Sequence, residues 1–503
     1  MKLLAGLVVA AVVCTGSVAH AAPEFVRLSY ASAATDTEIA ITWNTPADVG
    51  TTVEYGLAPG SLTMSETGTS FQATGALGYI HEVTLTGLTP DTTYYYRAGD
   101  AADGFSIEHT FTTGPAQHPE CGEVTFAYLG DNRPDPTFGG GENYDAILGE
   151  LFAHAPEFIL TGGDMVEDGD DIGQWRTMLG YTEDVFNTRP FMPTLGNHDD
   201  GPVEGDGAHY NDVFALPRAM GTGGSGTEDY YYFTYGNAIF VSLSTETFTG
   251  GATAFADQAA WLDEVLTANP KRWKIVYYHK PNYTYEVFFS ISHPPNEEGQ
   301  NAALVAVLDE HHVDVVITSH NHWYERYEPS ACGTMGSPGS DDPCSVGADN
   351  YEDGTVYVVS GGAGAFTIPG FLCGSPSGRA TCSGDHHYLL FEVTNDSLQM
   401  ETWSAPPEAS DIIDVITITK PTADCAAPTN PDAGPGPGID SGPGGTIDGG
   451  DPLGDPDGGD PGADGEDSGG CCRVAGDDTP PAGALVLALA VGLVVLRRRR
   501  RRR

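Results

Sequence analysis

Basic side chains are scarce in this chain of 503 residues. Only 22 Lys and Arg stand against 70 Asp and Glu, which gives a formal net charge of −48. Seven of the basic residues form the run at 497–503, so the rest of the chain is more acidic still. A surface of this sign repels polyanions. We therefore expect no nucleic acid among its partners.

Two common metal-binding patterns are also missing. No two of the nine cysteines have the CxxC spacing of a zinc site. The DPDGGD fragment near the C-terminus lacks the spacing of an EF-hand or of calcium-binding nonapeptide repeats. The sequence therefore favours neither a thiolate zinc site nor a calcium loop.

The N-terminus has the pattern of a cleaved secretory signal. Residues 1–21 contain one Lys, an apolar run, and small residues at Ala19 and Ala21. This predicts a protein that is secreted, or held at the cell surface or outer membrane. In such an oxidising compartment, the six cysteines between signal and tail favour disulfide bonds, for which 15 connectivities are open. Our hypothesis is three pairs, Cys332–Cys344, Cys373–Cys382 and Cys121–Cys425.

Residues 23–113 have the pattern of a small antiparallel β-sandwich. Short alternating runs such as EIAITW and IHEVTLTGL are separated by clusters of Gly, Pro, Asp and Thr. The stretch LTGLTPDTTYYYRAGD resembles the tyrosine-corner strand of fibronectin type III modules, with Tyr94 as the corner residue. We therefore predict a fibronectin type III-like domain.

Residues 122–420 have a different pattern. Apolar runs such as VTFAYLGD, EFILTGGD, KIVYYHK and DVVITSH alternate with the helical stretches NYDAILGELFAHA, FADQAAWLDEVLTAN and NAALVAVLDEHH. This alternation predicts an α/β layered domain. In such sheets ligands bind at the carboxyl ends of the strands.

The C-terminal part has two segments. Residues 426–470 contain almost no apolar side chains and predict a disordered, acidic linker rich in Gly, Pro and Asp. Residues 471–503 contain Cys471 and Cys472, an apolar run at 482–496, and seven Arg. The run is shorter than the roughly 20 residues that span a bilayer, although Arg stems can snorkel. This tail resembles the C-terminal sorting tails of myxobacterial surface proteins, and a permanent transmembrane anchor is the alternative; both imply a membrane or cell-surface partner.

Five polar blocks follow apolar runs in the central domain, at the ends of its expected strands. They are LGDNRP with Asp131, GGDMVEDG with Asp164, LGNHDD with Asn197 and His198, YYHKPNY with His279, and SHNHWYER with His320 and His322. Carboxylates, an amide oxygen and imidazoles suit iron, manganese or zinc. A site for two such ions needs an anionic bridge, and a carboxylate can supply it.

The order and spacing of these blocks resemble the calcineurin-like metallophosphoesterase superfamily. The N-terminal sandwich and the run HNHWYERYEP are more closely similar to the purple acid phosphatases, and the resemblance covers residues 23–403. It implies that the α/β domain is a β-sheet sandwich flanked by helices. It also implies a centre of two divalent or trivalent ions (Fe, Mn or Zn).

The resemblance further assigns a role to each block. Asp164 would bridge the two ions. Asp131 and His322 would belong to the first ion, and Asn197, His279 and His320 to the second. His198 would bind the phosphoryl group or protonate the leaving group, with Asp199 either its orienting partner or a plain surface acid.

Two positions depart from the family. Glu167 stands where the purple enzymes have a metal-binding Tyr, and Arg133 stands where their non-purple relatives have a His. Glu167 would supply a carboxylate oxygen to the first ion, or water would take that place. Arg133 would bind phosphate, since a guanidinium matches phosphate geometry, or would pair with an acid. A metal-binding Tyr gives the colour, so we expect a colourless protein.

The remaining histidines are weaker candidates. His293 is the one candidate for the histidine-containing loop that follows His279 in the purple enzymes. For His311, His312, His386 and His387 we expect structural roles. His81 lies in the predicted sandwich and is not expected to be catalytic.

The leading hypothesis is an acid phosphatase-like phosphomonoesterase that hydrolyses small phosphate esters outside the cell. One alternative is a phosphodiesterase or nucleotidase of the same superfamily. Another is a surface adhesion or binding protein whose phosphatase domain has decayed. Nothing in the sequence indicates an oligomeric state.

Overall fold

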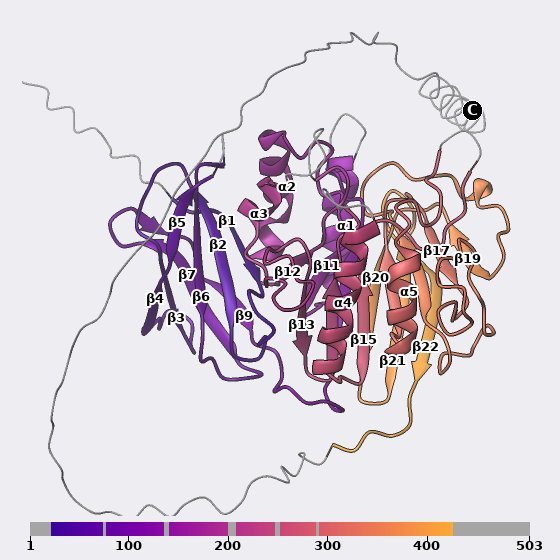
Figure 1. The fold of residues 1–503 in the computed structure, drawn as a ribbon. Helices are drawn as coiled ribbons and strands as arrows, with labels where there is room; N and C mark the ends of the chain where they lie inside the picture. Colours follow the sequence, from indigo (N-terminus) through magenta and orange to yellow (C-terminus); the bar gives the residue numbers. More distant parts are fainter. Residues whose placement is uncertain are drawn as a thin grey trace, which may run out of the picture. The chain divides into compact units, whose positions relative to one another are not determined.

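The computed structural model describes residues 22–73, 77–134, 140–199, 208–246, 252–287 and 291–425. Within them the chain forms an antiparallel β-sandwich followed by an α/β layered domain, so the predicted fold class is confirmed (Figure 1). The predicted signal, the acidic linker and the C-terminal tail lie outside the described residues. No helix in the described part is long and apolar enough to cross a membrane.

Two sheets form the N-terminal sandwich. One has the strand order β1 (Glu24–Ser29), β2 (Ile39–Thr45), β6 (Tyr79–Leu85), β5 (Thr69–Gln72). The other contains β4 (Met64–Thr67), β3 (Thr52–Gly56), β7 (Thr93–Asp100) and β8 (Gly104–Phe105), and β9 (His109–Thr112) also pairs with β7. The Tyr94 hydroxyl accepts the Thr89 N–H at 3.0 Å, which is the predicted tyrosine corner. His81 is buried between the hydroxyls of Thr45 and Thr51, a structural role.

Two further sheets face each other in the second domain. The six-stranded sheet has the order β12 (Phe191–Pro193), β11 (Phe158–Thr161), β10 (Val124–Leu129), β20 (His387–Val393), β21 (Ser397–Ser404), β22 (Ile412–Thr419). The seven-stranded sheet has the order β13 (Tyr231–Tyr235), β14 (Ala238–Ser242), β15 (Trp273–Tyr277), β16 (Val315–Thr318), β18 (Val356–Ser360), β17 (Tyr324–Tyr327), β19 (Arg379–Ser383). Phe126 of β10 meets Phe240 of β14 edge to face, with ring centroids 4.9 Å apart, so aromatic packing joins the sheets.

Helices cover the outer faces of these sheets (Figure 1). They are α1 (Gly140–Ala153), α2 (Ile172–Phe186), α3 (Ala208–Val213), α4 (Ala252–Ala268) and α5 (Asn301–Glu310), with a 3-10 turn at Gly370–Leu372. Leu262 of α4 and Leu304 of α5 pack in one buried cluster with Val241 and Val276 of the seven-stranded sheet. The helices expected at 143–155, 255–269 and 301–312 correspond to α1, α4 and α5.

The strand directions bring the polar blocks together. Strands β10, β11 and β12 are parallel neighbours in one sheet, and β14, β15 and β16 are parallel neighbours in the other. The blocks with Asp131, Asp164 and Asn197 follow the first three strands, and those with His279 and His320 follow β15 and β16. Because parallel strands end at the same edge, the fold gathers these blocks there, as predicted.

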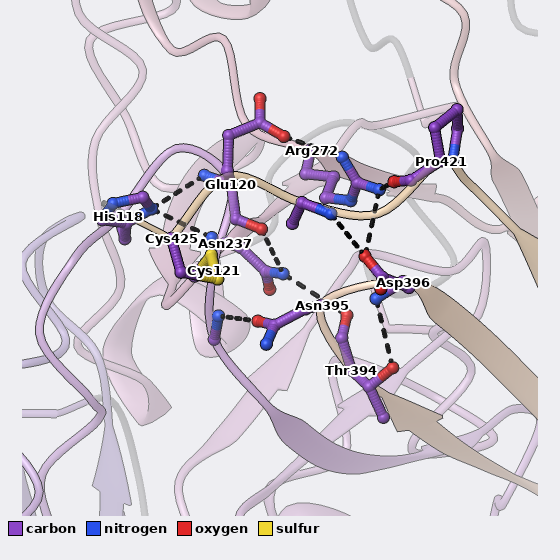
Figure 2. The surroundings of a disulfide bond; sticks show 12 residues. His118, Glu120, Cys121, Asn237, Arg272, Thr394, Asn395, Asp396, Pro421 and Cys425 are labelled. Atoms are coloured by element: carbon purple, nitrogen blue, oxygen red, sulfur yellow. Dashed lines mark hydrogen bonds and ion pairs between the residues drawn. A yellow bond between two sulfur atoms is a disulfide. The ribbon is translucent and has the colours of Figure 1, made fainter. Parts of the chain in front are cut away.

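The three expected disulfides are all present. Cys121 and Cys425 are 304 residues apart and join the two ends of the second domain. Figure 2 shows the surrounding bonds: Arg272 pairs with Glu120 at 2.7 Å and with Asp396 at 3.4 Å. Arg272 also donates to the Pro421 carbonyl, and the Ala423 N–H donates to Asp396 at 2.7 Å. The segment just before β10 and the last residues of the domain are therefore tied both by the disulfide and by a shared network of ion pairs and hydrogen bonds.

Removing this long-range disulfide should cost more than removing a short one. A chain-entropy estimate gives about 5 to 6 kcal/mol for a loop of this length, against about 3 kcal/mol for a loop of roughly ten residues. We expect Cys121→Ser/Cys425→Ser to lower the midpoint of denaturant unfolding more than Cys373→Ser/Cys382→Ser does. Equal losses for the two double variants would contradict this ranking.

Candidate metal centre

Three of the predicted ligands adopt a backbone conformation that side chains rarely take. Asp131, Asp164 and His320 have φ values of 55°, 53° and 68°. Each follows a buried strand, β10, β11 or β16, and each conformation costs on the order of 1–3 kcal/mol. Such strain persists only where the surrounding structure enforces it, and it is concentrated at functional sites.

Two glycines allow the loops after β11 and β12 to touch. A Cβ on Gly196 would lie 2.3 Å from both the backbone nitrogen and Oδ1 of Asp164, and a Cβ on Gly163 would lie 2.5 Å from the Gly196 nitrogen. Gly163 also has φ 86°. Only hydrogen atoms fit between these two backbones, so both positions require glycine.

Asp199 holds the same two loops together. Its buried carboxylate accepts the N–H groups of Asp164 (2.8 Å), Met165 (2.7 Å), Val166 (3.3 Å) and Gly196 (2.9 Å). Neither sequence-based alternative for Asp199 was right, since it is not a surface acid and it bonds the loop backbone instead of His198. The reason is geometric, because the chain turns after Asn197 and directs Asp199 inward.

Four acceptor atoms converge around His279. The Nδ1–H of His279 donates to the Gly162 carbonyl at 2.7 Å, which leaves the lone pair of Nε2 free. This Nε2 lies 2.9 Å from Asn197 Oδ1, 3.3 Å from Asp164 Oδ1 and 3.0 Å from His320 Nδ1. Acceptors packed this closely repel one another unless a cation lies among them. This donor set fits a metal ion, and we call it the second donor group.

Glu297 orients one member of that group, His320, and was not assigned a role from the sequence. Its Oε2 lies 3.0 Å from His320 Nε2, so the proton of His320 is directed outward and the Nδ1 lone pair inward. Hydrogen bonds from His293 and His320 hold the pKa of Glu297 far below its usual range. The signal that could have found it is the spacing of four between His293 and Glu297, which brings the two side chains to 3.5 Å.

Asp131, Asp164 and His322 form a first donor group. Asp131 Oδ1 is buried without a hydrogen-bond partner and lies 3.2 Å from His322 Nε2. The Nδ1–H of His322 donates to the Phe366 carbonyl at 2.8 Å, so Nε2 carries a lone pair. An unpartnered buried carboxylate oxygen facing an imidazole lone pair fits a cation between them.

Burial sets the protonation of these ligands. It lowers the pKa of His322 to about 3 and the pKa of His279 and of His320 below the usual value, so all three imidazoles are neutral near pH 7. Burial also raises the pKa of Asp131 to about 7, although His279 opposes this. Burial acts in the same direction on Asp164, but neighbouring His279, His198 and Arg133 outweigh it and keep its pKa low. Neutral imidazoles are the form that binds metal.

Arg133, Glu167 and His198 lie beside the first donor group. Arg133 Nη1 donates to Glu167 Oε2 and to His198 Nε2, both at 2.9 Å, and Arg133 Nε lies 3.7 Å from Asp164 Oδ2. The backbone N–H of His198 donates to Asp164 Oδ1 at 3.0 Å. Glu167 thus pairs with Arg133, and its carboxylate is not part of either donor group. Arg133 takes the role of an ion-pair partner here.

A cavity of about 250 Å³ opens above the two groups. Its polar lining includes Arg133, Asp164, Glu167, His198, His293, His320, Asn321 and His322, and its apolar lining is Ile291, Phe366 and Ile368. The His293 ring lies against the His320 ring at a tilt of 40°, with ring centroids 3.8 Å apart. Among the described residues, none of His311, His312, His386 and His387 lines this cavity or belongs to a donor group.

Comparisons with known proteins agree with this arrangement. Residues 23–113 match the model of the purple acid phosphatase N-terminal domain, and residues 124–324 match that of calcineurin-like phosphoesterases. Purple acid phosphatase 21 of Arabidopsis thaliana is 28% identical over 339 residues, covering 63% of this chain and 72% of the plant protein. Purple acid phosphatase 18 of the same plant is 26% identical over 352 residues, covering 68% and 71%. The structure of purple acid phosphatase PPD1 from yellow lupin seeds matches at a TM-score of 0.65 and 20% identity, covering 81% of this chain and 78% of that one.

Fold, donor groups and matched families together define an enzyme of the calcineurin-like phosphoesterase class. More particularly, the chain is a purple acid phosphatase-like hydrolase, distantly related to the plant proteins. Such a hydrolase implies a site for two metal ions, and both donor groups described above fit that requirement.

Substituting Gly196 should disrupt the metal centre without removing a ligand. We expect Gly196→Ala to displace the Asp164 loop, because the new methyl would overlap the Asp164 backbone, and to lower the metal content of the purified protein. Gly149→Ala is the matched control, since a Cβ there meets nothing within 4 Å. Metal analysis of both variants checks this, and an unchanged metal content in Gly196→Ala would refute it.

Proposed function

We propose that this protein hydrolyses phosphate monoesters at a centre of two metal ions, outside the cell. The observation that carries the proposal is one buried carboxylate, Asp164, shared by two donor groups at the floor of a cavity. The first ion would be held by Asp131, Asp164 and His322. The second would be held by Asp164, Asn197, His279 and His320, a set suited to iron, manganese or zinc.

The bound ions and the histidines around the cavity would have different roles in the reaction. Bound ions supply Lewis acidity toward the phosphate oxygens and the attacking water. His198 faces the cavity and is fixed through its backbone N–H and through its Nδ1–H, which donates to the Glu167 carbonyl at 2.7 Å. Its Nε2, which accepts from Arg133 Nη1 at 2.9 Å here, is the atom we assign to the phosphoryl group or to the leaving-group oxygen; in that role it would leave Arg133 and carry a second proton. His293, which lines the same cavity beside His320, would orient the ester.

The cavity and the net charge support a small substrate. A volume of about 250 Å³ accommodates a phosphoryl group with a modest leaving group against Ile291, Phe366 and Ile368. The strong negative charge disfavours nucleic acid as a substrate. The three disulfides and the signal-like N-terminus support export. Attachment to a membrane or cell surface through residues 471–503 stays a prediction.

Activity toward a monoester tests this function. The full chain should release p-nitrophenol from p-nitrophenyl phosphate, lose this activity with a chelator, and regain it with added metal. Asp164→Asn should reduce the rate to background because both donor groups lose their shared ligand. Asp145→Asn, an exposed position on α1, is the control. Faster hydrolysis of bis(p-nitrophenyl) phosphate would favour a phosphodiesterase, and chelator-resistant activity would exclude the metal centre.

The purified protein should be colourless. Glu167 stands at the position of the colour-giving Tyr, and its carboxylate pairs with Arg133. No tyrosine lines the cavity among the described residues. We therefore expect no visible charge-transfer band between tyrosinate and iron after reconstitution with iron, and an absorption spectrum checks this. A visible band would show that another tyrosine reaches the centre.

A further inference from the structure

The guanidinium of Arg133 occupies the lone pair that His322 would offer to a metal ion. Arg133 Nη2 lies 2.5 Å from His322 Nε2. Because the proton of His322 is on Nδ1, bonded to the Phe366 carbonyl, Nε2 acts as the acceptor in this contact. An imidazole nitrogen has one lone pair, so it cannot accept from Arg133 and bind an ion at the same time.

Arg133 also places a positive charge beside the acidic side chains of the first donor group. Its side chain is 9% exposed, and it contacts Glu167, His198 and Asp164 in addition to His322. A guanidinium keeps its charge in proteins, and here its nitrogens lie 2.9 Å from a Glu167 oxygen and 3.7 Å from an Asp164 oxygen. A fixed positive charge beside a cation site weakens cation binding there.

The second donor group has no such competitor. In the described part of the chain, His279 Nε2 and His320 Nδ1 lie close to each other, and His279 Nε2 also lies close to Asn197 and Asp164. Among the described residues, no Arg or Lys nitrogen hydrogen-bonds to either imidazole. The two halves of the centre therefore differ in the charge and the hydrogen bonds that an incoming ion meets.

We propose that Arg133 is an internal competitor for the first metal ion. The second donor group then holds its ion tightly, and the first group holds a weakly bound, exchangeable divalent ion that enters only when Arg133 releases His322. This inference rests on the two-ion centre of the proposed function. It adds that the side chain of Arg133, and not only the missing family ligand, causes the difference in metal affinity between the two donor groups.

Metal titration of the full chain tests the inference without measuring activity. Metal-free protein is titrated with Mn²⁺, and free Mn²⁺ is followed by electron paramagnetic resonance. The unsubstituted chain should show two dissociation constants that differ by at least about tenfold. Arg133→Met, which keeps the length but removes charge and donors, should tighten the weaker constant by at least about tenfold and leave the tighter one nearly unchanged.

Two further variants make the outcome decisive. Arg133→Gln removes the charge in a smaller side chain and should shift the weaker constant in the same direction, so it serves if Arg133→Met folds poorly. Arg218→Met, an exposed arginine outside the cavity, should leave both constants unchanged.

The possible results separate the inference from the proposed function. Equal constants in the unsubstituted chain, or a weaker constant that stays the same or weakens further in both Arg133 variants, would overturn the role of Arg133 alone. If the unsubstituted chain binds no Mn²⁺, Zn²⁺ or iron at either group, the proposed function fails as well. One ion in the unsubstituted chain and two in Arg133→Met would support the inference.

Discussion

The buried negative charge of Asp164 is the constraint around which the centre is organised. Its carboxylate is 1% exposed and lies within 4.0 Å of nitrogens from Arg133, His198 and His279. A buried carboxylate is costly unless cations or donors surround it. The backbone of Asp164 is strained, two glycines allow its loop to approach the next loop, and Asp199 accepts four N–H groups from these loops. The rest of the domain supplies the two parallel strand edges that deliver its partners.

The sandwich and the catalytic domain belong to one compact unit, and specific hydrogen bonds join them. Arg27 Nε donates to the Val213 carbonyl at 2.7 Å, and Ser29 Oγ donates to the Ala215 carbonyl at 2.6 Å. One continuous hydrophobic cluster includes residues of both domains. The Tyr96 hydroxyl also donates to the Asn187 carbonyl, just after α2, at 2.7 Å. Since buried hydrogen bonds and shared apolar packing resist relative motion, the sandwich supports the segments at the ends of α2 and α3.

The residues that the structure gathers into the two donor groups were all candidates from the sequence, for a physical reason. Each block follows a short buried strand, and the period of apolar residues reveals both the strand and its end. The same reasoning could not predict the contacts of Glu297, Asp199 and Arg133. These contacts depend on how loops that are distant in the sequence meet in the fold. Helix α2 was also missed, although Asp171 caps it by accepting the Gly173 N–H. The pairing of Glu167 with Arg133 shows the same limit. The spacing of the motifs identified both residues as departures from the family, but it could not show that the two side chains contact each other.

The disulfide between Cys121 and Cys425 has a mechanical consequence. Strand β22 is the outermost strand of its sheet, and a pull on the chain at Cys425 would otherwise peel it away one hydrogen bond at a time. The covalent bond instead transfers such a load to Cys121, just before the central strand β10. Strand β10 is hydrogen-bonded along both of its edges, to β11 and to β20, whereas β22 is paired to β21 alone. A load from the chain beyond Cys425 would thus bypass the edge strand β22 and reach a strand that is paired on both sides.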